Sequence, residues 1–213
     1  DEYGVDPVYQ VQAGEKETDF RSYLMKAKAA NPDVIVLSGL VDETVRMLVQ
    51  SYEVGIPKGV HRVANSVASK VEVPTNAGKA AVGVSYAAAF AASDTRPIAK
   101  KFVKHIKSRY GVVPGHDFSQ MEDLLTMLKP ALEKAEKRFS GDLASDRKAV
   151  RDSIAGITNF TGLASGPISF CAAGSPECRD GNRTPVMIEY TKGGKNWKTK
   201  VAGTVTFNAS AGL

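Results

Sequence analysis

The chain has 213 residues, of which 43% are hydrophobic and 24% are charged, as in globular proteins that bury a sizeable core. No apolar run is long enough to cross a membrane. The net charge of +5 is not arranged as a basic stripe with interleaved aromatic residues, which argues against a nucleic-acid binder. The densest basic stretch, residues 100–111, is interpreted as a solvated helix face, with a docking surface for a partner as the alternative.

Residues 18–57 predict a helix, a buried strand and a second helix. The apolar face of the first helix has helical spacing: Phe20, Tyr23, Leu24, Ala27 and Ala30. Pro32 ends it, and the apolar block Val34–Leu37 predicts a strand covered on both faces, as in a parallel sheet. A second helix is expected to begin near Asp42 and to stop at Gly55 and Pro57.

Other segments extend this pattern. Short strands are predicted at Val8–Val11, Val60–Ala64 and Val82–Tyr86, with a weak helical stretch from Ser69 to Ala80. The resulting β-α-β-α-β order predicts a parallel sheet with right-handed crossovers. We therefore expect an α/β fold.

The character of the sequence changes after Ala87. The small residues that follow suit a hinge or linker, and three helices are then expected. The first starts near Pro97, the second is kinked or divided at Pro130, and Ser145 caps the third. From Gly166 the pattern indicates strands, with a hairpin turn at residues 193–196.

The strongest candidate binding site follows the buried strand. Ser38, Gly39, Leu40 and Asp42 combine a short polar side chain, a permissive glycine and the start of a helix, which suit a carboxylate or amide ligand. Asp42 could instead be only the helix N-cap. Asn65 and Ser66 end the next strand and offer further hydrogen-bonding groups, with simple turn residues as the alternative interpretation.

Several phrases of the sequence together resemble a known family. The segment KAANPDVIVLSG and the later GIP, then NAGKAAVGVSY, DRKAVRDSIAG and GPISF, resemble the substrate-binding proteins of branched-chain amino acid ABC transporters. These are type I periplasmic binding proteins. The resemblance covers nearly the whole chain and implies two α/β lobes joined by a hinge, with the amino-terminal part missing here. It assigns residues 1–88 to the second lobe, helices 89–170 to the first lobe, and residues 171–213 to a β-rich return.

The resemblance also bears on the site. In the family, residues at the end of this strand contact the ligand, and an aromatic often faces the cleft near Phe118. A packing role at the start of the long helix is the alternative for Phe118. Leu40 stands where some relatives carry an aromatic, and the segment of Asn65 lacks the glutamate of leucine-type binders. A neutral or anionic solute is therefore as plausible as an amino acid.

The cysteines and histidines of the sequence indicate structural roles rather than metal binding or catalysis. Cys171 and Cys178 flank the turn-forming Gly174 and Pro176, which favours a structural disulfide over a free thiol pair and suggests an oxidising compartment. The three histidines have no metal-ligand spacing, and we expect no metal and no cofactor.

The predicted function is capture of a small polar solute by hinge closure and its presentation to ABC permease subunits. The expected location is periplasmic or extracellular. The alternatives are a ligand-sensing receptor domain with the same fold and, less favoured because no nucleophile and base converge, an enzyme. We expect residues 98–154 to expose apolar surface, which would favour self-association.

Overall fold

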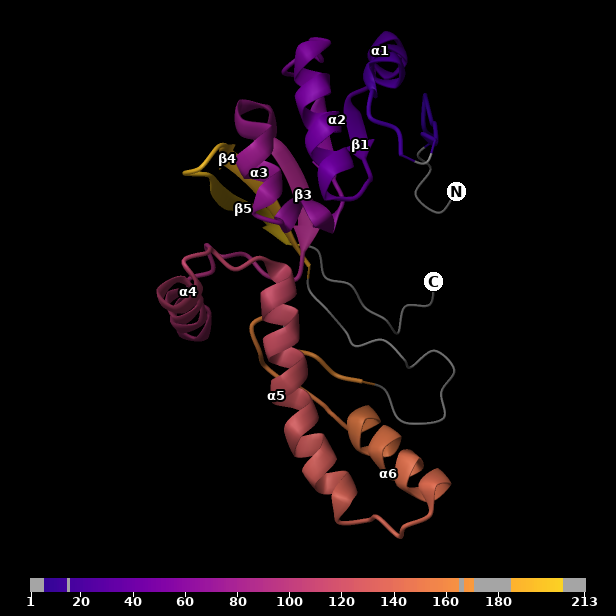
Figure 1. Ribbon diagram of the computed structural model, residues 1–213, viewed down its shortest axis with the longest axis vertical. Coiled ribbons are helices and arrows are strands. Elements are labelled where there is room, and N and C mark those ends of the chain that lie inside the picture. Colours follow the sequence, from indigo (N-terminus) through magenta and orange to yellow (C-terminus); the bar gives the residue numbers. More distant parts are fainter. Residues whose placement is uncertain (1–5, 15, 165–166, 171–184, 205–213) are drawn as a thin grey trace. The chain divides into compact units, whose positions relative to one another are not determined.

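The structure is a computed structural model that describes residues 6–14, 16–164, 167–170 and 185–204. The chain divides into two compact units (Figure 1). The first unit comprises Asp1–Ala87 and Met187–Ala202, and the second comprises Ala88–Val186 and Gly203–Leu213.

A five-stranded sheet forms the frame of the first unit, with the strands in the order β1-β2-β3-β4-β5. The strands are β1 Val34–Leu37, β2 His61–Ala64, β3 Val84–Ala88, β4 Val186–Lys192 and β5 Lys198–Thr204. β1 pairs with β2, and β2 with β3, in parallel, as the strand and helix order predicts. Leu37 is aligned with Ala64, and Ala64 with Tyr86, so these strands end at the same edge of the sheet.

The helices of the first unit connect these strands. They are α1 Arg21–Ala29, α2 Val41–Glu53 and α3 Glu72–Ala77, with short 3₁₀ turns at Ser66–Ser69 (η1) and Gly78–Ala81 (η2). α2 and α3 lie side by side on the sheet (Figure 1). The start of α1 is held by buried Gln50, whose Oε1 accepts the Phe20 N–H at 2.5 Å while its Nε2 donates to Thr18 O at 2.9 Å.

Two sequence predictions about the β1 edge are wrong. Ile35 and Leu37 are buried, whereas Val34 and Val36 are 49% and 72% exposed, so β1 is covered on one face rather than two. Residues 8–11 form no strand, although their short alternation of apolar residues suggested one. β1 is therefore an edge strand of the sheet, at the opposite end from β5.

β4 and β5 form the hairpin that the sequence predicts. The turn of this hairpin lies close to the backbone of α3 and η2. A Cβ built on Gly193 would lie 1.7 Å from Gly78 O, so only glycine fits there. Gly194 N donates to Pro74 O at 2.8 Å. The hairpin is thus fixed against α3 and η2 as well as in the sheet.

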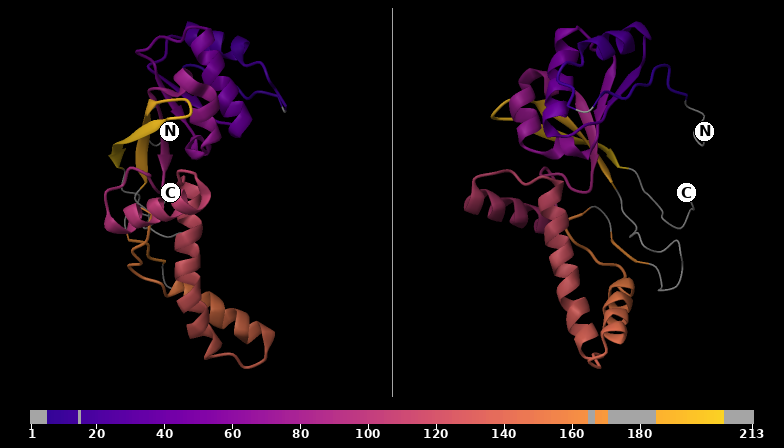
Figure 2. Two further views of the ribbon diagram at one scale, coloured as in Figure 1. Left: turned by 60° about the vertical axis from the view of Figure 1, so that its left-hand side comes forward. Right: turned by 45° about the vertical axis from the view of Figure 1, so that its right-hand side comes forward.

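The second unit contains α4 Pro97–Tyr110, α5 His116–Glu136 and α6 Leu143–Ala155, and α5 packs against α6 (Figure 2). Phe90, in the segment expected to be a hinge, is 2% exposed and packs with Phe102 and Leu163, and the boundary between the two units falls at the start of that segment. α5 continues through Pro130 as one helix, which excludes a division there. The prediction that Ser145 caps α6 is wrong. The cap of α6 is Asp142, whose carboxylate accepts the Ser145 N–H at 2.8 Å.

The chain between residues 160 and 164 is held from two sides in the second unit. The carboxylate of Asp123, which is 3% exposed, accepts the N–H groups of Leu163 at 2.6 Å and Ala164 at 2.7 Å. The guanidinium of Arg96 donates to Leu163 O at 2.6 Å and pairs with Asp94 at 2.7 Å. Donors and acceptors of this segment are therefore satisfied by side chains from α5 and from the residues before α4.

Candidate functional site

The candidate site lies where β1 and β2 end. Because these strands are parallel and in register, the segment 38–42 and the segment 65–66 follow from the same edge of the sheet. Asn65 N donates to Leu37 O at 3.2 Å, which extends the strand pairing by one step. The structure thus brings together two groups of residues that are far apart in the sequence, with Asn65 and Gly39 separated by 26 positions. This adjacency was predicted from the strand order.

The side chain of Asn65 joins the two loops directly. Its Nδ2 donates to Gly39 O at 3.0 Å and lies 3.5 Å from Ser38 Oγ. Its Oδ1 is buried and accepts no hydrogen bond from the described residues. An acceptor of this kind is costly to leave unpaired, and a donor from a ligand or a water molecule would satisfy it.

The loop after β1 enters α2 through a backbone cap. Leu40, rather than Asp42, is the N-cap residue, and its N–H donates to Glu43 Oε2 at 2.8 Å. Asp42 lies in the first turn and is exposed. A Cβ on Gly39 would lie 2.9 Å from Glu43 Oε2 and 3.0 Å from Met47 Cε, so a larger residue would displace these two side chains. The sequence did not single out Glu43, although a Glu three residues after a helix start is a known capping signal.

Four of the predicted residues are open to solvent. Ser38, Leu40, Asp42 and Ser66 have exposed side chains, and Leu40 is 72% exposed. The serine hydroxyls can donate or accept, and the amino-terminal end of α2 favours negative charge. Asp42 supplies a carboxylate for a positive group. The edge can therefore hold a small solute that has both an acceptor and a donor.

Two tyrosines behind this edge position η1, the turn that follows Asn65. The Tyr190 hydroxyl donates to Ala68 O, and the rings of Tyr190 and Tyr86 have centroids 5.2 Å apart. The two hydroxyls also share a hydrogen bond. Burial raises the pKa of Tyr86 to about 12 and raises the pKa of Tyr190 as well. Both rings are therefore neutral supports, and sequence reasoning did not assign them this role.

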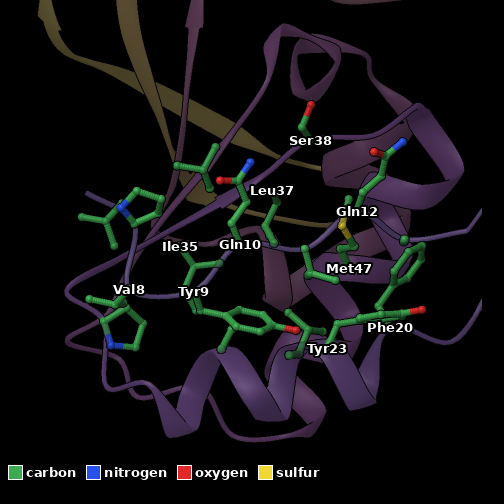
Figure 3. Close-up of a pocket in the computed structure, with 18 of the residues that line it drawn as sticks. Val8, Tyr9, Gln10, Gln12, Phe20, Tyr23, Ile35, Leu37, Ser38 and Met47 are labelled. Carbon is green, nitrogen blue, oxygen red and sulfur yellow. The ribbon is translucent and has the colours of Figure 1, made fainter. Parts of the chain in front are cut away.

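A cavity of about 630 Å³ lies between residues 7–14 and β1 (Figure 3). Its walls include the apolar side chains of Phe20, Ile35, Leu37 and Met47, and Ser38 lies on the opposite side of the cavity from Tyr23. Ser38 thus belongs both to this cavity and to the edge shared with Asn65.

The remaining predicted residues are not brought to this edge by the described structure. Phe118 belongs to the second unit, where it is the third residue of α5 rather than a residue before the helix, and it is 44% exposed. Cys171 and Cys178 lie outside the described residues. Among the described residues, no cluster of three or more His, Cys, Asp or Glu side chains could hold a metal ion.

The helices that the structure describes include none that is long and apolar enough to cross a membrane. Comparison with curated proteins gives no match. Solved structures do match, and they show a common fold at low sequence identity.

Three of these structures illustrate the likeness. A leucine-binding protein from Thermotoga maritima has 24% identity and a TM-score of 0.71, over 90% of this chain and 49% of that one. An amino acid ABC transporter substrate-binding protein from Pseudomonas fluorescens has 17% identity and a TM-score of 0.74, over 99% and 54%. A solute-binding protein from R. palustris in complex with benzoate has 19% identity and a TM-score of 0.68, over 92% and 51%.

The chain therefore spans about half the length of these solved structures. A family model described as periplasmic binding protein matches residues 1–179, which is most of the chain. This match confirms the resemblance stated from the sequence. The mostly parallel sheet with flanking helices agrees with it. The chain belongs to the periplasmic binding protein family and has the type I fold.

Proposed function

We propose that the chain belongs to the solute-binding component of an ABC transporter and that its solute binds at the carboxyl ends of β1 and β2. The observation that carries this proposal is the junction of Asn65 with Gly39 and Ser38, where exposed polar groups gather beside the start of α2. Ligands of open α/β sheets bind at this edge, where helix N-termini face outward. Family membership supports the same interpretation.

The mechanism is closure of the two compact units on the solute. The chain passes between the units at Ala87 and Ala88, at Val186 and Met187, and at Ala202 and Gly203, and the first two passages are the proposed hinge positions. A solute that contacts both units in the closed arrangement stabilises that arrangement over the open one. Phe118, which is exposed on the second unit, is proposed as the contact that this unit makes with the solute.

The solute class is a small polar molecule: an amino acid, an amide or a related organic acid. Solved relatives of this fold include proteins named as binding leucine and isoleucine, and others crystallised with benzoate and 3,4-dihydroxybenzoic acid. Here the second strand ends in neutral Asn65 and Ser66, and Asp42 is the carboxylate among the proposed ligand residues. This charge pattern admits a neutral or anionic solute as readily as a zwitterion.

The partners and location follow from the same proposal. The loaded protein would present its solute to the permease subunits of the transporter, outside the cytoplasmic membrane. The family supports this role, which needs no catalytic group.

A ligand-induced thermal shift tests the proposal. Leucine, isoleucine, benzoate and a simple primary amide are titrated against the wild-type chain, Asn65→Ala and Asn76→Ala. Asn76 is an exposed asparagine of α3 and serves as the control. At 100 times Kd a ligand adds about 2.7 kcal/mol to the free energy of unfolding.

We expect one class to stabilise the wild type and Asn76→Ala equally, and to bind Asn65→Ala at least about tenfold more weakly, a loss of roughly 1.4 kcal/mol. Equal shifts in all three proteins would place the solute elsewhere. The absence of any shift would count against solute binding by this chain.

A further inference from the structure

η1, the turn that follows Asn65, is held by a side chain from a distant part of the sequence. The hydroxyl of Tyr190, on β4, donates to Ala68 O. Both residues are buried, so this hydrogen bond is made away from bulk water, and its loss would leave a buried carbonyl without an equivalent partner. Ala68 N donates in turn to Asn65 O at 3.0 Å. A shift of Ala68 is therefore transmitted directly to Asn65.

Asn65 is attached on its other side to the loop that follows β1. Its backbone N donates to Leu37 O at 3.2 Å, and its side-chain Nδ2 donates to Gly39 O at 3.0 Å and lies 3.5 Å from Ser38 Oγ. Asn65 thus lies between two anchors, the loop after β1 on one side and the buried hydrogen bond to η1 on the other. The polar edge keeps its geometry only while both anchors hold.

Tyr190 is itself held rigidly. Its ring contacts that of Tyr86, with centroids 5.2 Å apart, and that of Trp197, with centroids 6.2 Å apart and ring planes nearly perpendicular at 88°. The hydroxyls of Tyr190 and Tyr86 also share a hydrogen bond. A buried ring packed between two others has few alternative rotamers, so its hydroxyl stays at a fixed place relative to the sheet.

Packing of the core does not require the Tyr190 hydroxyl. A phenylalanine would supply the same ring contacts, and a buried hydroxyl costs free energy unless it is hydrogen-bonded. Here the turn that carries Asn65 supplies a carbonyl that accepts this hydrogen bond. The hydroxyl therefore indicates a role in placing the turn, in addition to the packing of the ring.

The two tyrosines stand on the strands that carry the proposed hinge. Tyr86 lies on β3 shortly before Ala88, and Tyr190 lies on β4 shortly after Val186. The chain passes between its two units at these ends of the strands. The link from the hinge strands to Asn65 thus consists of one pair of aromatic rings and one short turn.

We propose that Tyr190 is a positioning residue of the solute site: its hydroxyl holds η1 so that Asn65 stays beside Gly39, and through it the hinge strands act on the site. This inference rests on the proposed function of the β1–β2 edge. Tyr190 itself is not in contact with the solute. It acts through Ala68 and Asn65, so its contribution to affinity should disappear when Asn65 is removed.

Hydrogen exchange in the solute-free chain is the first test. Tyr190→Phe keeps the ring and removes the hydroxyl, so the amides of Asn65 and Ala68 should exchange at least about tenfold faster than in the wild type. The amide of Leu24, on α1, is the internal reference and should be unchanged, as should all three amides in Tyr52→Phe, which removes a hydroxyl from an exposed ring. Unchanged exchange at Ala68 in Tyr190→Phe would overturn the proposal.

A double-variant cycle separates positioning from a general loss of stability. Calorimetry measures the Kd of leucine, isoleucine, benzoate and a simple primary amide for the wild type, Tyr190→Phe, Asn65→Ala and the double variant. For the compound that binds the wild type, Tyr190→Phe should weaken binding about tenfold, whereas the same change on top of Asn65→Ala should alter Kd less than about twofold. A further tenfold loss in the double variant would show that Tyr190 does not act through Asn65.

Trp197 provides a readout that needs no variant. It is the only tryptophan of the sequence, and its ring meets that of Tyr190 edge to face. The compound that binds in calorimetry should change the Trp197 emission with the same Kd, and Tyr190→Phe should lose this response. Binding without an emission change in the wild type would overturn the proposal. If none of the four compounds binds, the proposed function fails, and the exchange of Asn65 and Ala68 in Tyr190→Phe still decides whether Tyr190 positions the turn.

Discussion

The side-chain amide of Asn65 donates to the backbone oxygen of Gly39 at 3.0 Å, and this bond ties together the loops that leave two neighbouring strands. A side chain on Gly39 would displace that of Glu43, and Glu43 in turn accepts the Leu40 N–H at the start of α2. A change at Asn65 therefore reaches the start of α2 through two contacts.

Asn65→Asp should destabilise the fold. The substitution removes the donor to Gly39 O and sets a carboxylate beside that carbonyl, which leaves an acceptor facing an acceptor. We expect the free energy of unfolding to fall by about 1–3 kcal/mol. Urea denaturation measures this change. Asn76→Asp, at an exposed position of α3, should stay within about 0.5 kcal/mol of wild type. Equal effects at the two positions would show that the bond does not stabilise the fold.

Gly193→Ala should be among the most damaging single-methyl changes in the first unit. The added Cβ would lie 1.7 Å from Gly78 O, and both partners are backbone, so the hairpin turn would have to move off η2. The free energy of unfolding should fall by about 2 kcal/mol or more. Gly203→Ala is the matched control in β5, since a Cβ there meets nothing within 4 Å. If Gly193→Ala melts at the same temperature as the wild type, the hairpin turn does not pack against Gly78.

Asp123→Ala should loosen the second unit. It leaves the N–H groups of Leu163 and Ala164 without their acceptor in a buried setting. Each unsatisfied buried donor costs about 1–3 kcal/mol, so the two together should lower the free energy of unfolding by roughly 2–6 kcal/mol, measured by chemical denaturation. Asp146→Ala is the comparison, because Asp146 also accepts a backbone N–H, from Ser140 at 2.8 Å, but at an exposed site. The control should lose under about 1 kcal/mol.

Stability should fall in alkali because of the buried tyrosines. Folding raises the pKa of Tyr86 from an ordinary value near 10 to about 12, so the folded state keeps its proton where the unfolded state loses it. The stabilisation is complete below pH 10 and declines as pH rises towards 12, by up to about 1.4 kcal/mol per pH unit.

Tyr86→Phe cannot ionise, and it should therefore show a shallower decline over this range. The comparison uses the free energy of unfolding of wild type and variant at each pH. Parallel profiles for the two proteins would mean that Tyr86 ionises freely in the folded state. Tyr190→Phe should also flatten the profile, since burial shifts Tyr190 in the same direction.

The sequence was sufficient to predict the parallel core of the first unit. Local sequence signals determined α1, β1 and α2. These signals are the helical spacing of Phe20 and Leu24, the apolar block Val34–Leu37 and the residues that end helices, Pro32 and Gly55. The adjacency of Asn65 and Gly39 followed from the rule that neighbouring parallel strands end at one edge. The ligand roles of Ser38, Leu40, Asp42, Ser66 and Phe118 stay predictions.

Other features could not be predicted because they depend on distant partners. The apolar block Val34–Leu37 predicts a strand, but it does not indicate whether other elements cover both faces of that strand. Val34 and Val36 are in fact exposed. Gln50 caps a segment 30 residues earlier, and Asp123 holds residues 40 and 41 positions later. Such side chains look like ordinary helix residues in the sequence. Only the fold shows which backbone groups they meet.

Tyr190 reaches Ala68 across 122 positions, and β4 must join a sheet whose first three strands end at Ala88. During synthesis, β1, β2 and β3 are therefore followed by residues 88–185 of the second unit before β4 and β5 are made. At about 5–20 residues per second, the hundred residues between β3 and β4 leave β3 with an unpaired edge for several seconds. During that interval both outer strands of the nascent sheet, β1 and β3, have unpaired backbone groups. Such exposed edges favour aggregation and binding by chaperones.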